Sequence, residues 1–123
     1  MNHPVESHQH FQEGWVISRF IKSNDSSIHR RFVLALDLSR SMDGNGGQWR
    51  SVRDGLFRLF SHIPLGAEVA IVTFGAKARV NIEPTVVTEQ NREGIFGKIP
   101  FRLRDDENGC VACGLKLAAR LLR

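Results

Sequence analysis

Tyrosine is absent from this chain, cysteine occurs only twice, and no apolar run approaches the ~20 residues that a membrane-spanning helix requires. Met1 is followed by a segment that contains Asn2, His3, Pro4 and Glu6, so we do not see the basic segment and apolar core of a secretory leader. We therefore expect neither a membrane span nor a signal peptide in this chain. Two cysteines are too few to define a disulfide framework, and they leave the redox compartment open.

The basic residues do not form a cluster. The formal net charge is +4, but lysine and arginine are scattered along the sequence. The aromatic residues are mostly spaced like core positions, so they do not indicate a stacking surface for bases. This pattern argues against a nucleic-acid partner, since such proteins usually concentrate their basic residues on one face.

The hydrophobic pattern predicts strands that alternate with helices. The continuous apolar run at 32–36 is typical of a strand that is buried on both faces. The expected elements are a strand at 28–37, an amphipathic helix at 49–63, a strand at 67–74, an edge strand at 78–82, and helices at 88–98 and 111–122. A strand, a crossover helix and a second strand predict a right-handed parallel unit. The expected fold class is therefore α/β, a doubly wound and mostly parallel sheet.

Two boundaries follow from the same pattern. Residues 1–27 are rich in histidine, asparagine, glutamine and serine, with one apolar patch at 15–17. We expect them to be a polar lead-in that docks at most one short element, before a folded domain at 28–123. Because a doubly wound sheet normally needs four or more strands, we expect this domain to be partial and truncated after its third helix.

The segment Asp37-Leu38-Ser39-Arg40-Ser41 follows the first predicted buried strand. A carboxylate and two hydroxyls at alternate positions can direct three hard oxygens to one point, and Mg²⁺ and Ca²⁺ prefer oxygen ligands. Loops beyond the carboxyl ends of strands are also where α/β sheets bind ligands. The alternative is that Asp37 ends the strand, while Ser39 and Ser41 bond to local backbone in a turn.

These residues resemble the metal-ion-dependent adhesion site of von Willebrand factor type A domains, written Asp-x-Ser-x-Ser after the first strand. Asp37, Ser39 and Ser41 match it, and Met42 follows as it often does in that family. The resemblance implies that these three residues hold Mg²⁺ or Ca²⁺, directly or through water. It also implies a threonine from the loop before the third helix, an aspartate after the fourth strand, and an open coordination position that accepts a carboxylate from a partner protein.

A narrower resemblance covers residues 14–123. Trp15-Val16-Ile17, the segment 66–74, Ile99-Pro100 and the segment 110–115 are together similar to the calcium-activated chloride channel regulator family, and most similar to its arthropod members. The sequence departs from the type A pattern where the usual Gly-Gly-Thr is replaced by Asn108-Gly109-Cys110. The aspartate after the fourth strand would lie beyond Arg123.

Cys110 and Cys113 form a Cys-x-x-Cys at the start of the last predicted helix. A helix N-terminus lowers the pKa of a thiol, so three interpretations stay open. The pair is structural, as buried thiols or a disulfide; it is a redox centre; or it is half of a zinc site. No further Cys or His pair is spaced to complete such a zinc site.

The expected function is non-enzymatic. The module binds a protein that offers an acidic side chain, through Mg²⁺ or Ca²⁺ held by Asp37, Ser39 and Ser41. By resemblance, the parent protein is extracellular or at the cell surface. The alternative is a passive scaffold fragment of a secreted, self-processing, metalloprotease-type regulator of chloride conductance.

Overall fold

The computed structural model describes residues 7–11, 14–22, 28–37, 46–98 and 110–123. The described elements follow one another along the chain as β1 (Ser7–Phe11), β2 (Gly14–Lys22), β3 (Ile28–Asp37), α1 (Gly46–Ser61), β4 (Glu68–Phe74), β5 (Ala78–Val86), α2 (Arg92–Gly97) and α3 (Val111–Leu121). The strand predicted at 28–37 is confirmed with the same bounds, and the strand at 67–74 and the last helix differ from their predictions by one residue.

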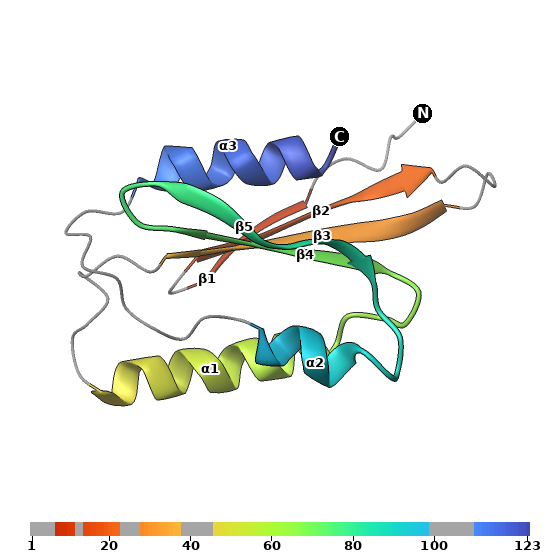
Figure 1. Cartoon of the computed structure of the whole chain (residues 1–123), viewed down its shortest axis with the longest axis horizontal. Coiled ribbons are helices and arrows are strands. Elements are labelled where there is room, and N and C mark those ends of the chain that lie inside the picture. Colours follow the sequence, from red (N-terminus) through yellow and green to blue (C-terminus); the bar gives the residue numbers. More distant parts are fainter. Residues whose placement is uncertain (1–6, 12–13, 23–27, 38–45, 99–109) are drawn as a thin grey trace.

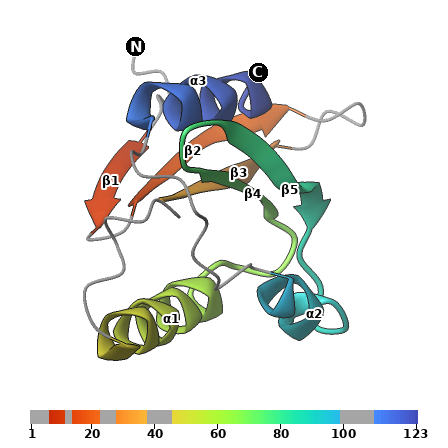
Figure 2. The ribbon, with the colours of Figure 1, turned by 60° about the vertical axis from the view of Figure 1, so that its left-hand side comes forward.

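The elements form three layers. A five-stranded sheet with the order β1-β2-β3-β4-β5 lies in the middle, with β3 as its central strand. Helices α1 and α2 cover one face of this sheet, and α3 covers the other face, as two views of the molecule show (Figures 1 and 2). Helices on both faces of a sheet confirm the predicted α/β class.

The prediction of a mostly parallel sheet is wrong, because the sheet is mixed. Only β3 and β4 are parallel, whereas β1 with β2, β2 with β3, and β4 with β5 are antiparallel. The connection lengths explain the difference. Parallel neighbours need a crossover of a dozen or more residues, and only the segment that contains α1 is long enough, while the other strand connections have room for hairpins alone.

The expected polar lead-in at 1–27 is also corrected by the structure, since this region contributes both β1 and β2 to the sheet. Val16 and Ile17 are buried on opposite faces of β2, so the strand lacks the simple alternation of a half-buried strand. Ser18 is buried as well, and its hydroxyl accepts a hydrogen bond from Arg30 on β3. The cluster 23–27, interpreted as a linker, connects two paired strands.

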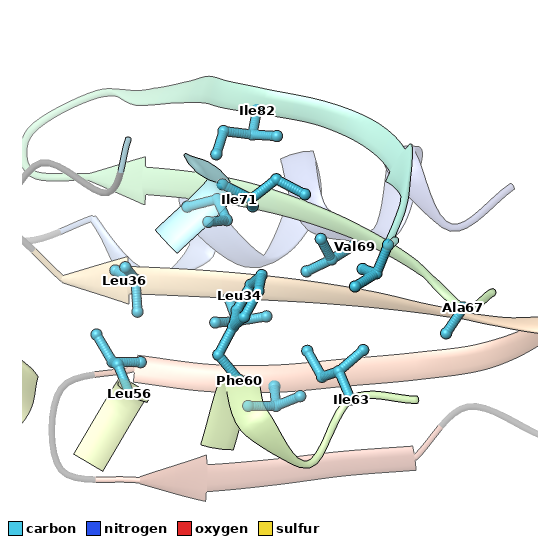
Figure 3. Packing of buried hydrophobic residues seen from close by; sticks show 12 residues of the cluster. Leu34, Leu36, Leu56, Phe60, Ile63, Ala67, Val69, Ile71 and Ile82 are labelled. Atoms are coloured by element: carbon cyan, nitrogen blue, oxygen red, sulfur yellow. The ribbon is translucent and has the colours of Figure 1, made fainter. Parts of the chain in front are cut away.

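Each central strand sends alternate side chains into two hydrophobic clusters. From β3, Leu34 and Leu36 contact the α1 side, where Leu56 and Phe60 pack against them (Figure 3). Val33, which precedes Leu34 on β3, belongs to the cluster on the α3 side. The same division on β4 places Val69 and Ile71 in the first cluster and Ala70, Val72 and Phe74 in the second. Both faces are covered, which accounts for the continuous apolar runs.

Strand β5 is an edge strand, as predicted, but it continues past the expected end at residue 82 to Val86. The pairing register with β4 shifts between Val69 and Ile71, opposite the stretch of β5 that contains Pro84. Proline has no N–H to donate, and it is tolerated in sheets at edge strands and bulges. The edge position and the bulge together let the strand pass through Pro84.

Helix α2 is shorter than the predicted helix at 88–98. Thr88 and Asn91 bond to each other in a turn that precedes it. The Thr88 hydroxyl accepts from the Asn91 amide at 3.1 Å, and the Asn91 side-chain oxygen accepts from the Thr88 amide at 2.8 Å. This reciprocal pair satisfies two backbone donors before the helix begins at Arg92.

Candidate functional site

The candidate site is the edge of the sheet at which β3 and β4 end. Asp37 is the last residue of β3, and its register partner is Phe74, the last residue of β4. Because the two strands are parallel, both carboxyl ends reach the same edge. The Asp37 side chain is partly buried there. This is the position at which loops of α/β sheets gather ligand-binding groups.

The start of β2 lies at the same edge, since β2 runs antiparallel to β3. Gly14 pairs with Leu36, the residue before Asp37. A Cβ atom at Gly14 would lie 1.9 Å from the carbonyl oxygen of Ala35, which is far inside van der Waals contact. Only glycine lets the backbone of β2 approach β3 this closely beside Asp37.

The N-terminus of α3 is attached to this edge on the other side. The Cys110 amide donates a hydrogen bond to the carbonyl oxygen of Gly75, the residue after β4, at 2.6 Å. Gly114 packs on the buried ring of Phe74, and a Cβ atom there would lie 2.4 Å from one ring carbon. The first turn of α3 is therefore fixed against the end of β4, and the positive end of its helix dipole favours a negatively charged group nearby.

Cys110 and Cys113 are joined by a disulfide. The Cys110 sulfur also accepts a hydrogen bond from the Cys113 amide at 3.1 Å, so it caps the helix. The disulfide agrees with the structural interpretation of the pair, and it is equally the oxidised state that a redox centre would have. The half-zinc interpretation fails in this state, because zinc is bound by thiolates. For the same reason, Cys110 cannot replace the family's loop threonine as a metal ligand here.

The structure places one of the three predicted metal ligands. Asp37 is at the carboxyl edge, whereas Ser39 and Ser41 lie outside the described residues, as do Asn108 and Gly109. Among the residues that the structure does describe, no three histidine, cysteine or acidic side chains are grouped to hold a metal ion. A cation at Asp37 would therefore take further protein ligands from other residue types or from residues outside the described ranges. Ser39 and Ser41 are such residues, and their hydroxyl oxygens suit Mg²⁺ or Ca²⁺.

A second polar cluster, at the opposite edge of the sheet, was missed by the sequence analysis. Glu68, at the start of β4, accepts hydrogen bonds from His29 and Arg31 of β3. Arg31 also donates to the carbonyl oxygen of Leu121 at 2.7 Å, at the C-terminus of α3. These contacts join two strands to the end of a helix. The two arginines at the start of the strand, Arg30 and Arg31, could have indicated an ion-pair cluster. The residues that contact Arg31 are remote in sequence, so the sequence alone did not identify them.

Comparison with known proteins identifies the fold family. The sequence profile of the von Willebrand factor type A domain matches residues 32–123. The chain belongs to this family. Type A domains are generally interaction modules and not enzymes, and they often hold Mg²⁺ or Mn²⁺ at the adhesion-site loop. Asp37 lies within the matched residues, at the end of the strand β3.

Among solved structures, the chain is similar to the crystal structure of an uncharacterized membrane spanning protein from Vibrio fischeri. The TM-score is 0.62 at 18% sequence identity, over 74% of this chain and 48% of that chain. The chain thus spans about half the length of that structure, and the likeness shows the shared type A fold alone. No curated protein matches the sequence. No helix within the described ranges is long and apolar enough to cross a membrane.

Proposed function

We propose that this type A domain is a divalent-cation-dependent protein interaction module. Asp37, Ser39 and Ser41 hold Mg²⁺ or Ca²⁺, and an acidic side chain of a partner protein completes the coordination. The observation that supports this most is the position of Asp37 at the shared carboxyl edge of the parallel pair β3 and β4. The N-terminus of α3, attached to the same edge through Gly75, would favour the incoming carboxylate.

Calorimetric titration with MgCl₂, CaCl₂ and MnCl₂ tests the cation site. Asp37→Ala removes the only charged ligand of the proposed set, so we expect its dissociation constant to rise by at least about tenfold. Asp54→Ala is the matched control, because it removes the same charge from an exposed position on α1. The proposal is wrong if no cation binds to the unmodified chain, or if Asp37→Ala binds as tightly as Asp54→Ala.

We further infer that the parent protein is a regulator of the calcium-activated chloride channel regulator type, located outside the cell or at its surface. Two observations support this. The Trp15-Val16-Ile17 motif of that resemblance lies within β2 of the same sheet. The Cys110–Cys113 disulfide is of a kind that persists in oxidising compartments. Sequencing the gene upstream of Met1 for a signal peptide and a His-Glu-x-x-His motif, and downstream for a strand that ends in aspartate, tests the inference.

The alternative is that the domain is a passive scaffold in a secreted, self-processing, metalloprotease-type regulator. One observation favours it. Cys110, at the position where the family usually supplies a threonine hydroxyl, is held in a disulfide. A scaffold would bind neither cation nor acidic partner, so the same titration separates the two proposals. The redox interpretation of the cysteine pair is a third candidate, and it requires that the chain reduce substrate disulfides.

A further inference from the structure

The paired ends of β2 and β3 extend beyond the helical layers of the molecule (Figure 1). On the face of the sheet that α1 covers elsewhere, this extension carries a set of side chains that we call the hairpin patch. Phe20 is 43% exposed and Ile28 is 68% exposed, although both are large apolar residues. The members of the hairpin patch are Phe20, Lys22, Ile28, Arg30 and Phe32.

Arg30 is held in place at the centre of the hairpin patch. Its Cζ atom lies 5.4 Å from the ring centroid of Phe20 and 5.3 Å from that of Phe32. Its Nε donates a hydrogen bond to the hydroxyl of the buried Ser18 at 3.0 Å. Two cation–π contacts and one hydrogen bond to a fixed acceptor restrict the guanidinium, so little side-chain entropy remains to be lost when it binds an anion.

The two Nη groups of Arg30 have no acceptor within the part of the chain that the structure describes. Arg31, the next residue, shows the contrast, because its guanidinium is used by Glu68 and by the carbonyl oxygen of Leu121. The other charged member of the hairpin patch, Lys22, is also a cation, and no described carboxylate is paired with either of them. Among the described residues, the hairpin patch therefore combines exposed apolar surface with positive charge that no carboxylate pairs with.

We propose that the hairpin patch docks an acidic segment of a partner protein. A carboxylate of this segment accepts hydrogen bonds from the two Nη groups of Arg30, and an adjacent apolar side chain covers Phe20 and Ile28. A planar guanidinium matches a carboxylate in two parallel hydrogen bonds, which a lysine cannot do. The positive charge and the exposed apolar residues together select an acidic segment with apolar neighbours.

This docking surface is separate from the cation site at Asp37. Arg30 and Asp37 are seven positions apart on β3, which corresponds to about 23 Å along an extended strand. Docking at the hairpin patch needs no divalent cation. A chelator therefore distinguishes the two proposals, because it abolishes binding through Asp37 and leaves binding through Arg30 unchanged.

An array of short peptides tests the proposal. Each peptide carries a glutamate or aspartate flanked by leucine or phenylalanine. Its counterpart, with glutamine or asparagine in place of the acidic residue, is printed beside it. With EDTA present, we expect the labelled chain to bind the acidic peptides and to bind their amide counterparts at least about tenfold more weakly. Arg30→Gln should weaken binding to the acidic peptides by a similar factor. Arg79→Ala, a loss of the same charge from an exposed position on β5, should leave binding unchanged.

Three results would overturn the proposal. These are equal binding to acidic and amide peptides, full binding by Arg30→Gln, and preferential binding to vesicles of phosphatidylserine or to a single-stranded oligonucleotide, which would show that the surface recognises phosphate. Circular dichroism and thermal melting establish that the variants fold. If Arg30→Gln does not fold, Phe20→Ala replaces it, because this change removes the exposed ring and should also weaken binding to the acidic peptides.

Discussion

A single methyl group at Gly114 should disturb the first turn of α3 and the end of β4 together. A Cβ atom there would lie 2.4, 2.8 and 2.9 Å from three carbons of the Phe74 ring. Carbon atoms pack best at about 3.5–4.0 Å, so the ring and the helix would have to separate by roughly 1 Å. The ring has little room to move, since Phe74 is fully buried and contacts the ring of Trp15.

Two opposing effects set the size of the change for Gly114→Ala. Alanine in a helix interior is more favourable than glycine by about 1 kcal/mol. Overpacking of a dense core costs about 1–3 kcal/mol, and contact with three ring atoms below 3.0 Å belongs near the upper end of this range. We therefore expect the free energy of unfolding to fall by about 1–2 kcal/mol. For a domain of this size, such a loss lowers the melting temperature by roughly 3–10 °C.

Gly55→Ala is the matched control, because it makes the same substitution in α1, where a Cβ atom would meet nothing within 4 Å. Only the propensity effect remains there, so this variant should gain about 0.5–1 kcal/mol. Urea unfolding followed by circular dichroism measures both variants. If Gly114→Ala is as stable as Gly55→Ala, the close contact between α3 and Phe74 does not exist. Calcium titration of Gly114→Ala then reports whether the displaced helix also weakens the Asp37 edge.

Two further predictions concern the ends of α3. Arg31→Ala breaks the partly buried ion pair with Glu68 and the hydrogen bond to the Leu121 carbonyl oxygen. We therefore expect the free energy of unfolding, measured in urea, to fall by about 2–3 kcal/mol. An unchanged unfolding midpoint would show that these contacts do not stabilise the fold. Reduction of the Cys110–Cys113 disulfide should lower the free energy of unfolding by about 2 kcal/mol. The effect is small because the disulfide joins residues only three positions apart in the sequence. Melting with and without dithiothreitol measures this cost, and an equal melting temperature with two titrated thiols would refute it.

The buried strands and the long helices could be predicted from sequence because their residues are covered on a definite face. Strand β3 has apolar residues on both faces, and Ala118 of α3 and the C-cap residue Leu122 lie in one cluster, so periodicity alone locates these elements. Asp37 could be placed at the end of its strand for the same reason. The seven residues from Arg31 to Asp37 pair in parallel with β4, as the single crossover helix between the two strands predicts.

Strand β2 could not be recognised from its own pattern, because its environment changes along its length. Val16 and Ile17 are buried on opposite faces, while Phe20, near the end of the strand, is exposed. Ser18 is polar yet buried, and only its bond to Arg30 explains it. The direction of pairing was also hidden, since it depends on a short connection that was interpreted as a domain boundary.

The distribution of close glycine contacts gives an independent argument for the importance of the carboxyl edge. Among six of the described glycines, Gly14 and Gly114 have no space for a Cβ atom, whereas Gly55, Gly66, Gly94 and Gly97 would meet nothing within 4 Å. The two crowded positions lie on either side of Asp37, one at the start of β2 and the other in the first turns of α3. A strand and a helix are thus brought unusually close to the ends of β3 and β4. Close packing on both sides fixes the backbone from which Asp37 extends, and a rigid backbone is what a cation ligand needs to hold its oxygen in place.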